Sequence, residues 1–329
     1  MKNTKVRALT DTSVAAALCV LLVIIIIYIP FLSTPMALVS GIPLMYICFK
    51  HNWRYGVLAG VCATLVAFVL TGNIITLALI MLTYVIPGLI FGICSSKGLK
   101  FMNSVFVSAL SAVLGFVLEL VLLNGGGNGI DDALAKIAET MNQSMNAAFS
   151  QMGVPLEGDI KLMIDTSVKQ AVNQIRLYIP SMIIILAVIY AYIVAGVGVF
   201  VLNRIRVKTP EYTKFYMIKA PKSMCVITII LFVICNVSQS TSLIMSAMHN
   251  LLFISAGIMG VCGLSAVDFK LHKKIRSGYI RAIVYVAVFF GAFMFASVLF
   301  MFLIMIGLTD GIFERRSIKK IGEDKNEDN

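Results

Sequence analysis

Ionisable side chains inside apolar stretches are the residues of this sequence that could do chemistry. Glu119 lies within the stretch GFVLELVLLN at residues 115–124, and His249 lies beside Asn250 in another apolar stretch. A charged group in hydrocarbon is unfavourable, so such a residue is a functional candidate by default. Glu119 could bind a cation, a proton or a ligand amine; alternatively, it reaches external water or pairs locally. For His249 we expect a structural hydrogen bond to a neighbouring helix.

Motifs of several known chemistries are absent. The sequence contains no Gly-x-x-x-x-Gly-Lys-Ser/Thr phosphate loop, no His-Glu-x-x-His, no Gly-x-Ser-x-Gly and no close pair of carboxylates in an apolar stretch. Its seven cysteines lie in or beside apolar stretches without a Cys-x-x-Cys pair, which is typical of small buried residues. We therefore expect no enzyme, no catalytic residue, no metal and no cofactor. An intramembrane enzyme would have to build its site from Glu119 or His249.

The elements that position these side chains are predicted to be membrane helices. Hydrophobic residues make up 59% of the 329, and charged residues 13%, against about 25% in soluble domains. About 20 apolar residues in a helix span a bilayer. The sequence contains eight long apolar runs and a ninth, shorter one at 36–49. Prolines lie in and before the short run, so we expect its helix to be broken or kinked. We predict an all-α polytopic membrane protein with eight or nine transmembrane helices. The eight long runs are 12–29, 55–70, 74–94, 105–123, 181–202, 223–237, 243–267 and 282–308.

The net charge of +11 is explained by its distribution along the chain. With the N-terminus in the cytoplasm, the cytoplasmic segments hold 18 of the 27 basic residues, and the short loops on the other side hold none. This is the positive-inside bias of a multi-pass cell-membrane protein. We expect lipid headgroups, and no nucleic acid, to be the partners of this charge. The basic segments are 2–7, 50–54, 97–100, 204–222 and 270–281.

One long insertion, residues 124–177, separates the fifth long run from the sixth. Apolar residues in its first half recur at spacings of three and four, as on one face of a helix. A second amphipathic stretch begins at Asp159 and leads into the next span near Pro180. The insertion could be two helices packed on each other or on headgroups, a lid over an outward-facing cavity, or an arm that docks a partner.

Small residues at four-residue spacing favour close helix packing. They occur in the first span as Thr12 with Ala16 and Ser13 with Ala17. This face could pack within the fold or dock another membrane protein.

The order of residues in the first 208 positions resembles the substrate-binding (S) subunits of energy-coupling-factor transporters. The whole chain resembles the YybS-type predicted membrane proteins of Gram-positive bacteria. The resemblance implies an S-subunit-like six-helix module at 1–208, with the insertion 124–177 inside it. The apolar runs that follow predict three additional helices at 209–308, and the charged composition of residues 309–329 predicts a disordered tail. The resemblance also implies that Thr12, Ser13, Ala16 and Ala17 dock a coupling membrane subunit, with separate ATPases supplying energy. The matching stretches are Leu9–Leu18, Ile42–Lys50, Trp53–Gly60, Thr71–Asn73 and Pro87–Gly92.

The leading functional prediction is a substrate-binding or transport component for a small solute whose identity the sequence does not give. The polar lining of its cavity is predicted to comprise Glu119, Asn124, Asn73 and Tyr178. The alternative is a non-transporting membrane scaffold, sensor or assembly factor. Such a protein would use the basic segments 203–222 and 268–281 to hold lipids or cytosolic partners.

Overall fold

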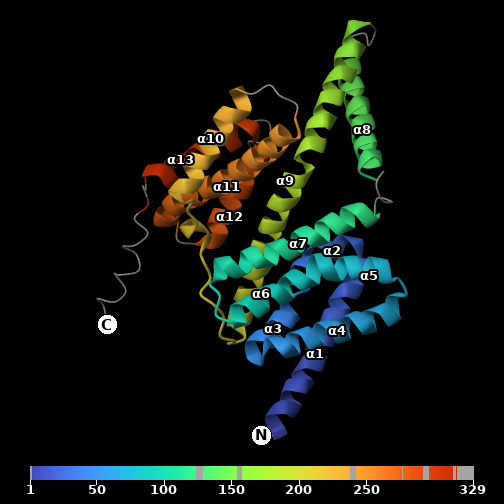
Figure 1. Ribbon diagram of the computed structural model, residues 1–329, viewed down its shortest axis with the longest axis vertical. Coiled ribbons are helices and arrows are strands. Elements are labelled where there is room, and N and C mark those ends of the chain that lie inside the picture. The colour runs from blue at the N-terminus through green and yellow to red at the C-terminus, as the bar shows by residue number, and fades with distance from the viewer. Residues whose placement is uncertain are drawn as a thin grey trace. The chain divides into compact units, whose positions relative to one another are not determined.

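The computed structural model describes residues 2–123, 129–153, 158–237, 242–275, 277–291, 296–313 and 316, and their regular structure is entirely helical (Figure 1). The chain divides into two compact units, Met1–Tyr212 (unit 1) and Thr213–Asn329 (unit 2). Seven helices in the described ranges are long and apolar enough to cross a membrane, and two shorter apolar helices accompany them. The prediction of an all-α polytopic protein is therefore confirmed, whereas the count of eight or nine spans stays a prediction.

Unit 1 contains a bundle of apolar helices and one helical hairpin. Small residues allow the bundle helices to approach closely: Ala59, Ala63 and Ala67 are fully buried and pack with Ala16 and Cys19. The elements are α1 (Lys2–Tyr28), α2 (Pro30–Val39), α3 (Ile42–Lys50), α4 (Trp53–Thr71), α5 (Ile74–Ile80), η1 (Met81–Val85), α6 (Ile86–Ser96), α7 (Phe101–Leu123), α8 (Gly129–Gln151) and α9 (Asp159–Arg204).

Two of the spans in unit 1 are irregular: one is broken between two helices, and the other is a continuous helix that widens into a π-helical turn. The proline-punctuated span breaks between α2 and α3 at Ser40–Gly41, as its sequence predicts. The following hairpin contains a second irregularity, the five-residue π-helix η1, which ends just before Pro87. The two irregularities meet, because a Cβ on Gly41 would lie 2.8 Å from the Cα of Gly88. Glycine at both positions permits this backbone contact.

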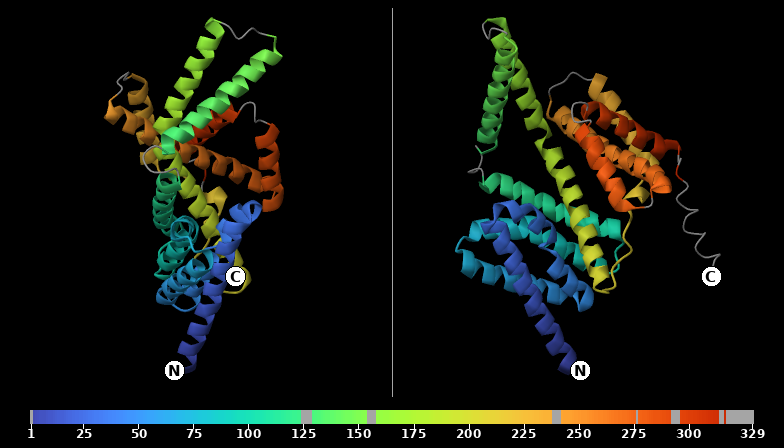
Figure 2. Two further views of the ribbon diagram at one scale, coloured as in Figure 1. Left: turned by 90° about the vertical axis from the view of Figure 1, so that its right-hand side faces the viewer. Right: turned by 180° about the vertical axis from the view of Figure 1, so that it is seen from behind.

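The insertion forms an antiparallel hairpin of α8 and the first part of α9 (Figure 2). Leu134 of α8 and Ile164 and Val168 of α9 are buried, and Asp131 forms an ion pair with Arg176. The interpretation of two helices that pack on each other is thus confirmed. The second amphipathic stretch and the sixth span are one continuous helix of 46 residues that passes through Pro180.

Unit 2 comprises η2 (Phe215–Met217), α10 (Lys222–Val237), α11 (Leu243–Lys274), α12 (Gly278–Gly291) and α13 (Ala296–Phe313). The span predicted for residues 282–308 covers parts of α12 and α13, and residues 292–295 between these two helices lie outside the described residues. Helices α11 and α13 cross in backbone contact: a Cβ on Gly263 would collide with the carbonyl oxygen of Leu303, and one on Gly307 with that of Met259.

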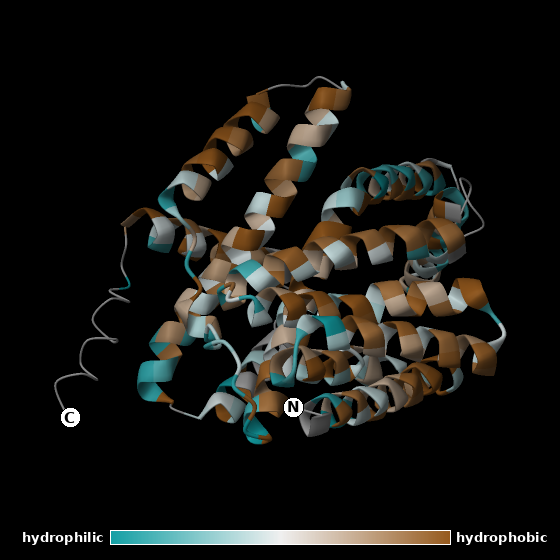
Figure 3. Cartoon of the chain, turned by 60° about the horizontal axis from the view of Figure 1, so that its bottom comes forward, coloured by the Kyte–Doolittle hydropathy of each residue, from teal (hydrophilic) through white to brown (hydrophobic). Residues whose placement is uncertain are grey.

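The outer surfaces of the helices are apolar. Figure 3 shows hydrophobic residues along most of the helical length, with hydrophilic residues concentrated at helix ends and in connecting segments. Large apolar side chains on these surfaces remain exposed, including Val69 at 80%, Leu110 at 67% and Leu114 at 62%. Exposed apolar surface of this extent is suited to lipid contact.

Candidate functional site

Glu119 lies within the apolar helix α7, and its carboxylate is incompletely hydrogen-bonded. One oxygen, Oε1, accepts a long hydrogen bond of 3.4 Å from the Tyr84 hydroxyl. The other, Oε2, is buried and has no hydrogen-bond partner among the described residues. Thr83 is a second polar neighbour of this carboxylate, and its own buried hydroxyl also lacks a partner within the described part of the chain. Polar groups buried in this way are normally partnered, so two such atoms side by side need an explanation.

Tyr84 connects the carboxylate of Glu119 to the break between α2 and α3, because its backbone carbonyl is contacted by Tyr190 and Ser40. The Tyr190 hydroxyl of α9 lies 3.0 Å from the carbonyl oxygens of both Ala37 and Tyr84. Ser40, at the break itself, lies 2.9 Å from the first of these carbonyls and 3.3 Å from the second. Side chains from other elements thus reach backbone groups where the regular helical ladder is interrupted. We call Ser40, Thr83, Tyr84, Glu119 and Tyr190 the Glu119 cluster.

The π-helix η1 places Thr83 and Tyr84 beside Glu119. Pro87 has no backbone N–H and its ring disturbs the preceding turn, which accounts for an irregular helix at this point. The carbonyl of Pro87 accepts a hydrogen bond of 2.7 Å from Ser108 of α7. Gly115 brings α7 against η1, because a Cβ there would lie 2.7 Å from the Cα of Thr83. Glu119 follows one helical turn later on the same face.

The predicted ligand contacts fall in different places. Asn73 is exposed and caps α5, where its Oδ1 accepts a hydrogen bond of 3.1 Å from the backbone N–H of Thr76. Tyr178 is partly buried on α9, two residues before Pro180. Asn124 lies outside the described residues. The structure links Glu119 to Tyr84, and the roles of all four predicted residues in binding a ligand stay predictions.

The structure divides the small-residue face of the first helix. Thr12 and Ala16 are 3% and 8% exposed, and the Thr12 hydroxyl donates a hydrogen bond to the Ala8 carbonyl. This pair packs inside unit 1, in line with the alternative that the face packs within the fold, and the docking role of all four residues stays a prediction. Ser13 and Ala17 are exposed on the neighbouring face of α1 and remain accessible to a partner.

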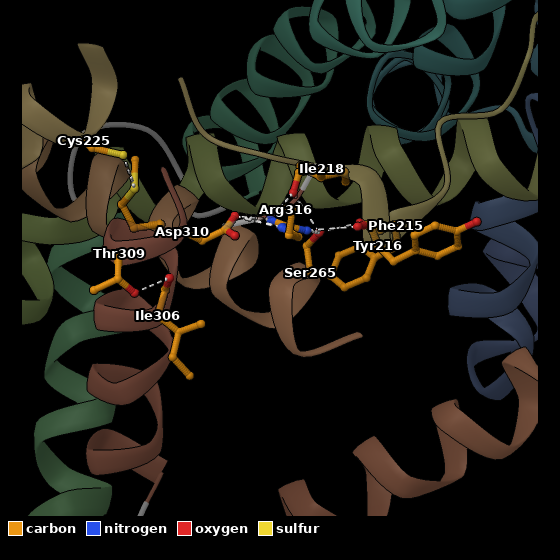
Figure 4. A network of polar contacts seen from close by, with 10 residues as sticks. Phe215, Tyr216, Ile218, Cys225, Ser265, Ile306, Thr309, Asp310 and Arg316 are labelled. Carbon is orange, nitrogen blue, oxygen red and sulfur yellow. Dashed lines mark hydrogen bonds and ion pairs between the residues drawn. The ribbon is translucent and has the colours of Figure 1, made fainter. Parts of the chain in front are cut away.

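Unit 2 holds a second buried polar cluster, formed by Ser265, Asp310 and Arg316 (Figure 4). We call it the Arg316 cluster. The guanidinium of Arg316 contacts Asp310 through Nε at 2.8 Å and Nη2 at 2.7 Å. Its remaining N–H groups donate to the Ser265 hydroxyl and to the carbonyls of Tyr216 and Ile218, at 2.9–3.0 Å. All five guanidinium donors are therefore used. The polar groups of η2, α11 and α13 hold one another together here.

His249, the other ionisable candidate, bonds within its own helix. Its Nδ1 lies 2.8 Å from the carbonyl oxygen of Met245, one turn earlier on α11. The expected bond to a neighbouring helix is thus replaced by a bond to a backbone group of the same helix, the usual arrangement for polar side chains in an apolar helix.

Several members of the Glu119 cluster escaped the sequence analysis. Tyr84 and Tyr190 are ordinary in apolar helices, and their hydroxyls gain significance through contacts across 106 residues of sequence. A usable signal was present in Pro87-Gly88, three residues after Tyr84, because this dipeptide interrupts an apolar span as Pro35 and Pro43 do.

Apolar helices of spanning length, with polar groups held between them, define a polytopic α-helical integral membrane protein. The family model described as "Predicted membrane protein (DUF2232)" matches residues 17–311, and the chain belongs to this family. It is 24% identical over 302 residues to the "Uncharacterized protein YybS" of Bacillus subtilis (strain 168), covering 88% of this chain and 91% of the relative. The resemblance to YybS-type proteins is therefore confirmed. No solved structure matches the chain.

Proposed function

We propose that unit 1 is a non-catalytic, solute-binding component of a membrane transport system, with the Glu119 cluster as its binding site. The observation that carries this proposal is the carboxylate of Glu119, which lies in an apolar helix with only a long hydrogen bond of 3.4 Å from Tyr84 and a loose contact with the Thr83 hydroxyl among the described residues. A small solute with a cationic or hydrogen-bond-donating group would satisfy the carboxylate, and a polar acceptor on it would satisfy the hydroxyl.

The meeting of two helix irregularities supports this site. In secondary transporters, discontinuous helices at the middle of the membrane bind substrates and ions through exposed backbone groups. Gly41 and Gly88 bring these two irregularities together next to Tyr84 and Tyr190. The resemblance of residues 1–208 to S subunits favours the same role, with six helices, a cytoplasmic N-terminus in the cell membrane and energy supplied by separate ATPases. In this arrangement the α8–α9 hairpin is an external lid, and exposed Ser13 and Ala17 dock a coupling subunit.

The test is a thermal-stability screen of the detergent-solubilised protein against amines, vitamins and metal ions. A ligand of the Glu119 cluster should raise the unfolding temperature of the wild type and of Glu139→Gln, an exposed carboxylate on α8. It should fail to stabilise Glu119→Gln, in which the charge is removed while the shape is retained. Equal stabilisation of Glu119→Gln by every ligand found would contradict the assignment.

The second candidate is a scaffold, sensor or assembly factor that holds anionic partners through basic segments. The exposure of Arg204, Arg206 and Lys208 after α9 favours this function. Deletion of residues 129–153 separates the two candidates: loss of the hairpin should alter ligand binding in a transport component and leave binding to a cytosolic partner intact.

A further inference from the structure

Unit 1 contains a polar cleft at one end of its spans, beside the start of α7, whereas Glu119 lies near the end of that helix. Its volume is about 650 Å³, within the range of about 300–1,000 Å³ typical of small-molecule sites. Three segments form its walls: residues 48–53 between α3 and α4, residues 95–100 between α6 and α7, and residues 208–210 after α9. Because each segment lies where a span ends or begins, the cleft lies near the boundary between bilayer and water.

The charge of the cleft is positive. Lys100 and Lys208 line it, both are exposed, and neither has an acidic partner among the described residues. No acidic residue contributes to its walls. The carboxylate of Asp11 is already engaged at 2.7 Å by His51 of the wall and at 2.8 Å by Lys50. Glu211 follows the wall residue Pro210 and forms no ion pair with either lysine among the described residues. Two uncompensated ammonium groups therefore remain for an anion.

Backbone N–H groups at the start of α4 also favour an anion in the cleft. Helix α4 begins in the wall at Trp53, and its N-cap residue Asn52 makes no side-chain capping bond. The N–H of Tyr55 donates to the Asn52 carbonyl, which leaves the N–H groups of Trp53 and Arg54 at the start of the helix for a ligand. Such N–H groups attract anions. The carbonyls at the end of α6 have the opposite polarity, but they accept hydrogen bonds from the N–H groups of Lys97, Gly98 and Leu99.

A buried hydroxyl in the wall lacks a partner. Ser95 is 8% exposed, and its Oγ makes no hydrogen bond to any described residue. A buried hydroxyl without a partner is unfavourable, and a ligand oxygen in the cleft would satisfy it. The indole of Trp53 completes this part of the wall and lies 4.7 Å from the Nζ of Lys97.

From these observations we infer that the cleft binds a net-anionic phosphate group, held by Lys100, Lys208, Ser95 and the start of α4. The group belongs either to the headgroup of an anionic phospholipid or to a water-soluble phosphate compound. Both present the same oxygens to the same donors, and lysine serves as a point charge for phosphate. This site is independent of the Glu119 cluster, so the two proposals can fail separately.

Trp53 supplies the measurement, because it is the single tryptophan of the chain. The full-length protein in uncharged maltoside micelles is titrated with short-chain phosphatidylglycerol in one arm. The second arm uses inorganic phosphate and pyrophosphate. We expect a saturable change in Trp53 fluorescence. A response to phosphatidylglycerol alone identifies the headgroup as the source, and a response to the soluble phosphates identifies a water-soluble compound.

The variants decide whether the cleft is responsible. In the double variant Lys100→Gln, Lys208→Gln, the half-saturating concentration should rise by at least about tenfold, because both charge-assisted contacts are lost. The control Lys136→Gln, Lys169→Gln removes the same charge from exposed positions of the α8–α9 hairpin and should bind as the wild type does. Ser95→Ala removes an unpartnered hydroxyl, so it should fold normally and bind several-fold more weakly. Absence of a saturable response in both arms, or unchanged binding in the double variant, would overturn the inference.

Discussion

The Glu119 cluster and the Arg316 cluster both place a charged side chain among apolar helices, and they differ in how completely it is partnered. In unit 2, five donors of Arg316 meet a carboxylate, a hydroxyl and two carbonyls. In unit 1, Glu119 has one contact of 3.4 Å and one oxygen without a partner in the described chain. A buried charge whose partners are all internal serves the fold, whereas one with vacant hydrogen-bonding capacity is available to a ligand.

The backbone around the two clusters differs as well: it is regular near the Arg316 cluster and irregular near the Glu119 cluster. Helices α11 and α13 are regular where they cross at Gly263 and Gly307. The Arg316 cluster joins both helices to η2. Around Glu119 the chain is interrupted twice, at Ser40–Gly41 and at η1. Irregular backbone in an apolar setting is typical of sites that bind something. The predictions below use buried thiols as reporters of each unit: Cys19 and Cys48 in unit 1, and Cys225 and Cys262 in unit 2.

The largest effect is expected from Arg316→Ala. This change leaves Asp310 buried without its cation, and breaking a buried ion pair lowers stability by about 3–5 kcal/mol. Alkylation of Cys225 and Cys262, followed by mass spectrometry in mild denaturing detergent, should accelerate while the thiols of unit 1 stay protected. Lys274→Ala removes an exposed charge from the same unit and serves as the control. Equal protection in both variants would show that the network contributes little.

Gly115→Ala tests the close approach of α7 to the π-helix. The new Cβ would lie 2.7 Å from a backbone atom of Thr83, so the two elements must separate. Overpacking of this kind lowers stability by about 1–3 kcal/mol. Alkylation of Cys19 and Cys48 should accelerate accordingly. Gly60→Ala is the matched control, because its Cβ would meet side-chain atoms at ordinary distances of 3.5 and 3.6 Å; similar results for both variants would argue against a tight contact at η1.

Tyr190→Phe should have a smaller effect. It removes the hydroxyl that lies 3.0 Å from the carbonyls of Ala37 and Tyr84, and such a bond contributes about 1 kcal/mol. Tyr192→Phe removes a hydroxyl of the same helix whose hydrogen bond of 2.9 Å to the Tyr212 hydroxyl is exposed, and we expect it to leave the backbone around η1 unchanged. Hydrogen exchange of the backbone around η1 measures the difference. If exchange there is the same in both variants, Tyr190 does not secure the break.

The broad architecture could be predicted because long apolar runs have few alternatives to membrane helices. The break near Gly41 was also predictable, since prolines mark it. The π-helix was missed, because continuous apolar sequence does not show where a helix widens. The position at which a helix widens depends on its packing against other helices, which hydropathy does not report.

The candidate site could be predicted less well than the fold. Glu119 stood out because a lone carboxylate in an apolar run is unusual, but its neighbours come from α2, η1 and α9. Arg316 looked like one more charge in a polar tail, and it is 6% exposed in the structure. In both clusters the informative feature is the set of partners, which depends on contacts between residues distant in sequence.

The central claim, that Glu119 serves a ligand and Arg316 serves the fold, is tested most directly by comparing Glu119→Gln with Asp310→Asn. Both changes remove a carboxylate charge and retain its shape, and the buried thiols report on each unit separately. We predict that Glu119→Gln leaves the stability of unit 1 within about 0.5 kcal/mol of the wild type. Asp310→Asn should lower that of unit 2 by about 1–3 kcal/mol, because it weakens the charged bonds to Arg316. If Glu119→Gln exposed Cys19 and Cys48 as strongly as Asp310→Asn exposes Cys225 and Cys262, Glu119 would be a structural residue and the account would be contradicted.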